Sequence, residues 1–358
     1  MDSRCAGAQL LHVDLHIDEH EPRKGILLLL SRLRPRWNAR DVKMKKFTEG
    51  ITNQLIGCYV ASLQEPGCVL VRLFGRMTEL FVNRDREVEM FQVFHAHGCG
   101  PEIYCSFQNG ICYEFVRGTV LDDQLLKQPS IYRLIAAEMG RIHSIQPKCA
   151  LPVEPLLWTK MSHFLTLMQS SIRSRPAEHS PSALREVPSF ETLSVEMKTL
   201  KRHLSRIDSP TVLCHNDLLT KNIIYNHTEG VVKFIDYEYA DYNYQAFDIG
   251  NHFNEFAGVN DVNYSFYPSR ELQRDWLTAY LESYKHSAGH EVTVTEAEVR
   301  QLYIQVCKFS LASNFFWGLW AILQSRFSSI DFDFERYATA RLNFYFEKKE
   351  EYFGLTIM

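Results

Sequence analysis

Four side chains between residues 215 and 236 have the types and the spacing of a phosphoryl-transfer site. His215, Asp217 and Asn222 stand in the order H-x-D-x-x-x-x-N, and Asp236 follows an apolar run at 231–235. Transfer of a phosphoryl group needs a carboxylate that orients and deprotonates the attacking hydroxyl, and oxygen ligands that hold Mg²⁺ against the phosphates. Asp217 suits the role of the base, and Asn222 and Asp236 suit the role of metal ligands.

A β-hairpin is the element that must position these groups. The runs 222–225 and 231–235 have strand character, and the residues between them have turn chemistry, with Gly230 supplying a positive φ. Antiparallel pairing would bring Asn222 beside Asp236 at one end of the hairpin. Taken singly, each of the three residues has a structural explanation, as a turn cap, an Asx turn or a surface carboxylate. Their combination at this spacing favours catalysis.

The composition bounds the class of protein. A chain of 358 residues favours two lobes over one core, and 46% hydrophobic with 23% charged residues is ordinary for a soluble enzyme. The formal net charge is -4 and the densest basic run, at 32–36, is short, so nucleic acid is not expected as a partner. The nine cysteines form no C-x-x-C pair and indicate reduced thiols. Without a signal peptide or an apolar run long enough to cross a bilayer, the chain is expected to be cytoplasmic and to have no transmembrane segment.

Strand patterns dominate residues 41–115, which we predict to form a nucleotide-binding lobe. An extension over residues 1–40, with a helix near 25–33, precedes it, and strands are predicted at 42–47, 55–60 and 68–74. The polar turn between the first two strands holds Gly50, Thr52 and Asn53, and its backbone N–H groups can bind phosphates. A plain hairpin turn would show the same pattern.

One cation, Arg72, lies inside an apolar strand of this lobe. It is a candidate for gripping the α and β phosphates, held by a carboxylate from a predicted helix at 83–96. Glu87 is the first choice for that carboxylate and Glu89 is the alternative. The competing interpretation is a side chain that snorkels from an edge strand into solvent.

A further hairpin, predicted over 103–107 and 110–116, closes the nucleotide-binding lobe. The hinge is expected after Glu114. The stretch 113–116, with Tyr113, Glu114 and Phe115, is the candidate purine site, because extended backbone can pair with the edge of an adenine. Any strand would show the same sequence pattern.

Residues 116–358 are predicted to form a mainly helical lobe. Helices are expected at 131–145, 190–207 and 295–326, and a surface loop at 170–189. His143 is expected to be structural. Polar residues interrupt the apolar part of the last helix, which favours a buried core helix over a membrane span. Trp317 and Trp320 share a face of it, and such aromatics are more often core, but beside a carboxylate they can hold an ammonium group by cation–π attraction.

These stretches together resemble the choline/ethanolamine kinase family, and most closely its ethanolamine kinase branch. The resemblance is carried by CHNDLLTKNIIY, FIDYEYADYNYQAFDIGNHFNEFAGV and FFWGLWAILQSRFSSIDFDFERYA. It implies an α+β, protein-kinase-like fold of two lobes, the smaller β-rich and the larger mainly helical. It also implies ATP- and Mg²⁺-dependent phosphorylation of ethanolamine to phosphoethanolamine, the first step of the CDP-ethanolamine route to phosphatidylethanolamine. Five residues fall on family positions that surround the ammonium of the amino alcohol: Glu255, Trp317, Trp320, Phe332 and Tyr337.

Two departures from the family pattern bear on the substrate. Small or polar residues follow Phe256 where choline kinases have more aromatic residues, which favours a primary ammonium. The turn at 50–53 has one Gly where some relatives have two. The alternatives are a choline kinase or a kinase of another small amino alcohol, a catalytically silent kinase-like binding protein, and a kinase of an aminoglycoside or sugar. A homodimer is left open.

Overall fold

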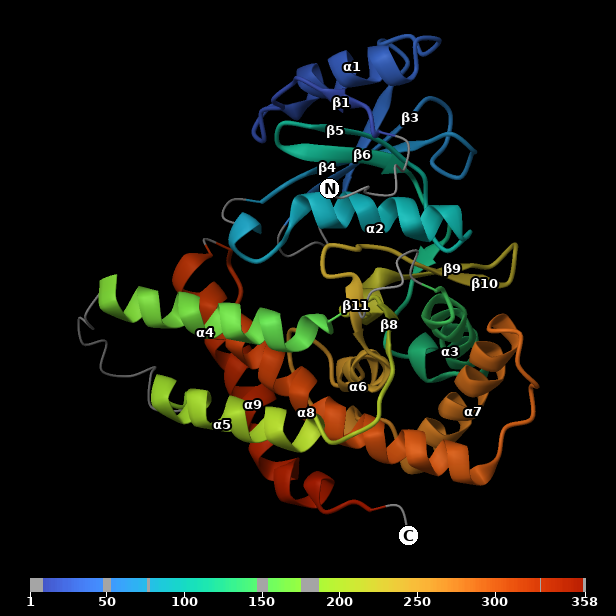
Figure 1. The fold of residues 1–358 in the computed structure, drawn as a ribbon. Coiled ribbons are helices and arrows are strands. Elements are labelled where there is room, and N and C mark those ends of the chain that lie inside the picture. Colours follow the sequence, from blue (N-terminus) through green and yellow to red (C-terminus); the bar gives the residue numbers. More distant parts are fainter. Residues whose placement is uncertain are drawn as a thin grey trace, which may run out of the picture. The chain divides into compact units, whose positions relative to one another are not determined.

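The computed structural model describes residues 9–47, 53–75, 78–146, 154–174, 187–328 and 330–356. Contacts within the chain divide it into two compact units. The first, here the N-unit, comprises Met1–Leu121 and Lys221–Glu238, and the second, here the C-unit, comprises Asp122–Thr220 and Tyr239–Met358. The N-unit holds most of the strands and the C-unit most of the helices, so the α+β class is as expected (Figure 1).

A six-stranded sheet forms the centre of the N-unit, in the order β1-β5-β6-β4-β3-β2. Its neighbouring strands are antiparallel, except that β1 and β5 are parallel. The predicted strands are present with small shifts at their ends. The bounds are β1 His12–Val13, β2 Lys43–Phe47, β3 Gln54–Tyr59, β4 Val69–Leu73, β5 Ile103–Phe107 and β6 Gly110–Glu114.

The predicted N-terminal extension is part of this unit's core. Helix α1, Pro22–Leu33, begins with a proline at its first turn, where no backbone N–H is needed. Its Ile26, Leu29 and Leu30 are buried in one cluster with Val13 of β1 and with apolar side chains of the sheet. Residues 9–33 therefore supply a strand and a core helix to the N-unit. Helix α2, Arg84–Ala96, begins at Asn83, whose side chain caps it by accepting from the N–H of Arg86.

The predicted catalytic hairpin groups with the N-unit. Strand β9, Ile223–Asn226, pairs antiparallel with β10, Val231–Phe234, and with the short β7, Thr119–Val120. Gly230 has φ +66 at the turn, as predicted. Pairing with β7 ties the hairpin to the chain that leaves the six-stranded sheet, and Tyr237, just after β10, stacks on Phe94 of α2.

The C-unit is built around α8, Glu296–Phe327, which is buried over most of its length. Thr295 and Glu298 form the predicted capping box. By length and composition it is the one helix among the described residues that could span a membrane, but 94% of that window is buried inside the structure. α8 packs against α9, α6, α7 and α4 (Figure 1). The other bounds are α3 Pro129–His143, α4 Leu156–Ser174, α5 Phe190–Leu204, α6 Gln245–Glu255, α7 Arg270–Ser287, α9 Phe334–Phe353, β8 Thr211–Cys214 and β11 Asp241–Tyr244.

One boundary in the helical half differs from expectation. The predicted loop at 170–189 begins too early, because α4 continues to Ser174; residues 175–186 lie outside the described part of the chain.

At Gly250 of α6, an added Cβ would lie 2.9 Å from the N of Ser310 and from the O of Val306 in α8. This glycine lets the two backbones approach closely.

The cysteines in the described ranges are free and buried: Cys58, Cys68, Cys99, Cys105, Cys112, Cys214 and Cys307.

Candidate active site

The hairpin places the two predicted metal ligands at one end, as its sequence indicates. Phe234 pairs with Ile223, and the N–H of Ile235 donates to the carbonyl of Asn222 at 3.0 Å. Asp236 is the next residue and has φ +66, a left-handed conformation that non-glycine residues seldom adopt. This turn of the chain ends the strand. The binding of a metal by Asn222 and Asp236 stays a prediction.

Arg72 is buried within the N-unit and bridges two carboxylates. Its Nη1 lies 2.9 Å from Oδ1 of Asp236, and its Nη2 pairs with Glu87 of α2. Glu89, the alternative partner, is exposed and pairs with Arg86 instead. With 1% of its side chain exposed, Arg72 does not snorkel to the solvent. Glu87, the first choice from sequence, is therefore the helix carboxylate that pairs with Arg72.

Two charged residues that the sequence analysis missed complete this cluster. One oxygen each from Glu87, Asp236 and Glu238 lie within 4.8 Å of one another. Arg84 pairs with Glu87 at 2.8 Å and with Glu238 at 3.2 Å. Glu238 could have been found from its position two residues after Asp236, but Arg84 carries no signal in the sequence beyond lying one turn before Glu87. Burial and the charge of Glu238 raise the pKa of Asp236 to about 6, against the two guanidinium groups.

The predicted phosphate turn is described only at its last residue. Nδ2 of Asn53 donates to Glu238 at 3.1 Å, and its Oδ1 accepts from the N–H of Gly75 at 3.3 Å. Asn53 therefore joins the turn to the carboxylate cluster. Gly50 and Thr52 lie outside the described residues.

The predicted purine segment is engaged in the six-stranded sheet. Tyr113 is buried and pairs with residues on both neighbouring strands. The N–H of Glu114 donates to Glu102 at 2.8 Å, and the N–H of Phe115 donates to Cys68 at 3.1 Å. Because these two N–H groups already have acceptors, a purine would have to pair with other backbone groups of this segment. Purine binding there stays a prediction.

Asp217, the predicted base, lies in the C-unit on a loop that a buried aspartate holds. Asp248 of α6 accepts from the N–H of His215 at 2.9 Å and from the N–H of Asn216 at 2.8 Å. Asn216 has φ +66, and its carbonyl accepts from Nδ2 of Asn251 at 3.1 Å. These contacts fix the backbone immediately before Asp217. Asp248 was not singled out from sequence, because its partners lie more than thirty residues away.

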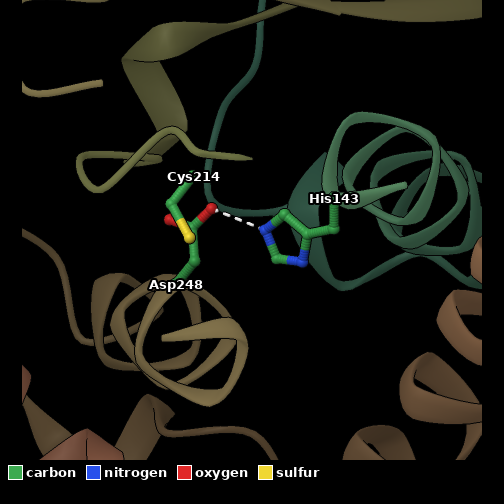
Figure 2. Close-up of side chains that lie close together, drawn as sticks. All are labelled: His143, Cys214 and Asp248. Atoms are coloured by element: carbon green, nitrogen blue, oxygen red, sulfur yellow. Dashed lines mark hydrogen bonds and ion pairs between the residues drawn. The ribbon is translucent and has the colours of Figure 1, made fainter. Parts of the chain in front are cut away.

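His143 donates to the same carboxylate, 2.9 Å away (Figure 2). Its other ring nitrogen lies 2.6 Å from the Tyr280 hydroxyl. It is structural, as expected. Burial acts to raise the pKa of Asp248, but the hydrogen bonds and charges of His143 and His215 outweigh it and hold the pKa below its usual range. Cys214 lies beside the pair in Figure 2, and burial raises its thiol pKa well above the usual value. A neutral thiol and a carboxylate occupied by three N–H donors make this cluster a support for the loop and a poor metal site.

The aromatic residues predicted to surround an ammonium are brought together in the C-unit. The rings of Trp317 and Trp320 meet edge to face at 5.4 Å, and Phe332 meets Tyr337 at 5.9 Å. The indole N–H of Trp317 donates to Asn251, and that of Trp320 donates to the hydroxyl of Tyr239. Burial raises the pKa of Tyr337 well above its usual value, and the charges of Glu255 and Asp217 add to the rise.

Glu255, predicted to face the ammonium, is buried at the end of α6 and pairs with Arg341 of α9 at 3.1 Å. The sequence analysis did not single out Arg341. The sequence held one weak indication of Arg341: it follows Tyr337 by four residues and so lies on the same face of that helix. Phe256, the one aromatic directly after Glu255, packs against His252 and Phe253. Its ring therefore belongs to the helical core.

The chain is similar to known kinases over nearly all of its length. The family described as choline/ethanolamine kinase matches residues 44–346. Ethanolamine kinase 1 of Homo sapiens is 51% identical over 340 residues, which cover 95% of this chain and 75% of that protein. Ethanolamine kinase 2 of Homo sapiens is 50% identical over 344 residues, covering 96% and 86%. The structure of an ethanolamine kinase from Plasmodium vivax superposes with a TM-score of 0.80 at 29% identity, over 92% of this chain and 89% of that one. The chain belongs to the choline/ethanolamine kinase family.

Proposed function

We propose that this protein transfers the γ-phosphoryl group of ATP to the hydroxyl of ethanolamine, which forms phosphoethanolamine and begins the CDP-ethanolamine route to phosphatidylethanolamine. The observation that carries the proposal is a group of C-unit side chains that we assign as the acceptor pocket. The buried carboxylate Glu255 and the charge of Asp217 both act on Tyr337, and the paired rings of Trp317 and Trp320 supply the aromatic faces. The relatives at about half identity, whose names specify ethanolamine, support the same acceptor.

The chemistry assigned to Asp217 is general base catalysis. Its carboxylate accepts the proton of the acceptor hydroxyl as the oxygen attacks phosphorus. Asp248 contributes by holding the preceding backbone in place, so that little reorganisation of the loop is needed during transfer.

The donor set at the end of the hairpin fits Mg²⁺, which prefers oxygen ligands and usually takes one or two carboxylates. Asp236 and Glu238 offer carboxylate oxygens and Asn222 offers an amide oxygen, whereas Glu87 is held by two arginines. When bound, the ion would neutralise and orient the phosphates of ATP. Arg72, which balances the carboxylates here, is the proposed contact to the α and β phosphates.

Ethanolamine suits this pocket better than choline on physical grounds. A primary ammonium carries three N–H donors and a compact hydration shell, so its site must supply acceptors. A quaternary ammonium has no donor and depends on aromatic faces. Glu255 supplies an acceptor, and the ring of Phe256 packs against His252 and Phe253.

An acceptor panel in a coupled ADP-release assay tests the proposal, with ethanolamine, choline, an aminoglycoside and a sugar as acceptors. The Asp217→Asn protein, prepared in parallel, corrects for contaminating ATPases. We expect the highest kcat/KM with ethanolamine, and phosphoethanolamine as the product by ³¹P NMR. A preference for choline would overturn the proposed acceptor, and binding of ethanolamine without turnover would favour a silent binding protein.

The proposed location is the cytoplasm, which the free state of the seven described cysteines supports. A homodimer stays a prediction, and light scattering on the purified protein would test it.

A further inference from the structure

Glu255 and Arg341 form a buried ion pair beneath the aromatic rings of the acceptor pocket. Glu255 is 4% exposed and Arg341 is 0% exposed. Nη2 of Arg341 lies 3.1 Å from Oε1 of Glu255. Two charges removed from water at this depth are stable only if they compensate each other closely. Any change to one of them should therefore be felt by the other.

The surroundings of Arg341 leave Glu255 as its carboxylate partner. The guanidinium lies over the ring of Tyr337 at 5.5 Å, and the Tyr264 phenol, which bonds to Asn314, is close by. Nε and Nη1 of Arg341 meet no hydrogen-bond acceptor among the described residues. Among the described side chains, Oε1 of Glu255 accepts the hydrogen bond from Arg341, and Oε2 accepts none. The arginine thus holds one carboxylate oxygen and leaves the other for a further donor.

The titratable groups near Glu255 come from several elements. Helix α9 supplies Arg341 and the phenol of Tyr337, and the turn at 264–266 supplies the phenol of Tyr264. Asp217, on the loop after β8, acts on Tyr337. Helix α8 contributes polar but neutral groups here, such as Asn314. The charges of Glu255 and Arg341 cancel each other within this set.

We propose that Arg341 is a positioning and specificity residue of the acceptor pocket: it keeps Glu255 ionised and orients it, so that Oε2 accepts a hydrogen bond from the substrate ammonium. This inference rests on the proposed function, since it assigns a role in binding the proposed acceptor. It adds a residue that acts through Glu255 and does not itself touch the substrate.

The role has a consequence for pH dependence. Burial raises the pKa of Glu255, and the charge and hydrogen bond of Arg341 oppose that rise. A raised pKa means that the carboxylate takes up a proton at a higher pH. Without Arg341 the opposing cause is lost, so Glu255 becomes neutral at a pH where the parent enzyme keeps it ionised. Binding of the ammonium should then weaken as the pH falls, earlier than in the parent.

The first experiment compares Arg341→Met and Arg341→Lys with the parent, by measuring kcat and KM for ethanolamine and ATP between pH 6 and 9. For Arg341→Met we expect KM for ethanolamine to rise on the order of 10-fold or more, because a hydrogen bond to a charged group is weakened. We expect kcat and KM for ATP to change much less, and the acid limb of kcat/KM to move to higher pH. Arg341→Lys restores the charge and should recover part of the loss.

A double variant makes the test independent of simple damage to the fold. Glu255→Gln alone leaves the guanidinium as an unpaired cation next to the substrate's cation. The Glu255→Gln, Arg341→Met protein removes both charges, and neutral replacement of a buried pair is often well tolerated. We therefore expect the double variant to have a lower KM for ethanolamine than Glu255→Gln. Arg336→Met is the matched control: it lies on the same helix, is exposed and pairs with Asp261 at the surface, and its kinetics should match the parent's.

The outcomes distinguish a failure of the role proposed for Arg341 from a failure of the proposed function. If Arg341→Met keeps the parent's KM and acid limb, or if the double variant is no better than Glu255→Gln, the role of Arg341 is refuted while the kinase assignment stands. If the parent enzyme itself does not turn over ethanolamine, the proposed function fails first, and this inference fails with it.

Discussion

Replacing Asp248 by Asn tests whether one buried carboxylate holds the catalytic loop. The substitution keeps the size of the side chain but turns one oxygen into a donor. That donor must face at least one of the three N–H groups that Asp248 now accepts, from His215, Asn216 and His143. A buried N–H left unpaired costs about 1–3 kcal/mol, and losing the charge on the remaining hydrogen bonds costs roughly as much again. The expected loss is about 3–5 kcal/mol, a large part of a typical domain's stability.

Activity should fall as well, because two of the three N–H groups that Asp248 accepts belong to the two residues before Asp217. A displacement of a reacting group by about 1 Å can cost on the order of 100-fold in rate, so we expect a kcat loss of that order. KM for ATP should change little, since the predicted nucleotide contacts belong to the N-unit.

Urea unfolding followed by tryptophan fluorescence is a suitable assay, because four of the five tryptophans lie in the C-unit. Asp261→Asn, at an exposed surface pair, serves as the control and should stay within about 0.5 kcal/mol of the parent. The pKa of Asp248 is held low in the folded protein, so its contribution is present above its unfolded pKa of about 4 and is lost as the pH falls through the folded pKa. The parent should therefore lose stability more steeply than the variant below about pH 4. A variant within 1 kcal/mol of the parent, with kcat within a few-fold, would refute the reasoning.

Three further predictions follow from the site and its supports. Asp217→Asn should lower kcat by at least roughly 100-fold while ATP still binds by calorimetry, because an amide cannot accept the hydroxyl proton; near-parental turnover would exclude the base role. Asp236→Asn should raise the Mg²⁺ concentration needed for half-maximal activity, and coincident Mg²⁺ titrations would make Asp236 structural. Gly250→Ala should destabilise the C-unit by about 1–3 kcal/mol in urea unfolding, since its Cβ would lie 2.9 Å from backbone atoms of Val306 and Ser310; an unchanged midpoint would show that α8 can yield.

Local patterns predicted the elements that carry the candidate site. The hairpin around Gly230 could be predicted because its strands and turn are adjacent in the sequence, and antiparallel pairing then fixes where Asn222 and Asp236 lie. Glu87 could be preferred over Glu89 for a related reason. The two residues lie on different sides of α2, so that Glu87 is buried and Glu89 is exposed.

The supports of the site were missed because they depend on distant pairs. Asp248 meets a residue more than a hundred positions away in His143, and Arg341 follows its partner Glu255 by 86 positions. Neither residue belongs to a periodic pattern that singles it out, and a charge in a helix is most often a solvated one. Burial and pairing are products of the tertiary packing of α3, α6 and α9, which local sequence does not encode.

The buried thiols give each half of the molecule its own reporter of opening. Cys58, Cys68, Cys99, Cys105 and Cys112 belong to the N-unit, and Cys214 and Cys307 belong to the C-unit. A buried thiol reacts with an alkylating reagent only when the surrounding structure opens, so labelling rates measure local opening free energies. With Cys5 and Cys149, which lie outside the described residues, replaced by serine, mass spectrometry of pulse-labelled protein would resolve whether the strand-rich and helical halves open together or separately. ATP and ethanolamine could then be ranked by which set of thiols each one protects.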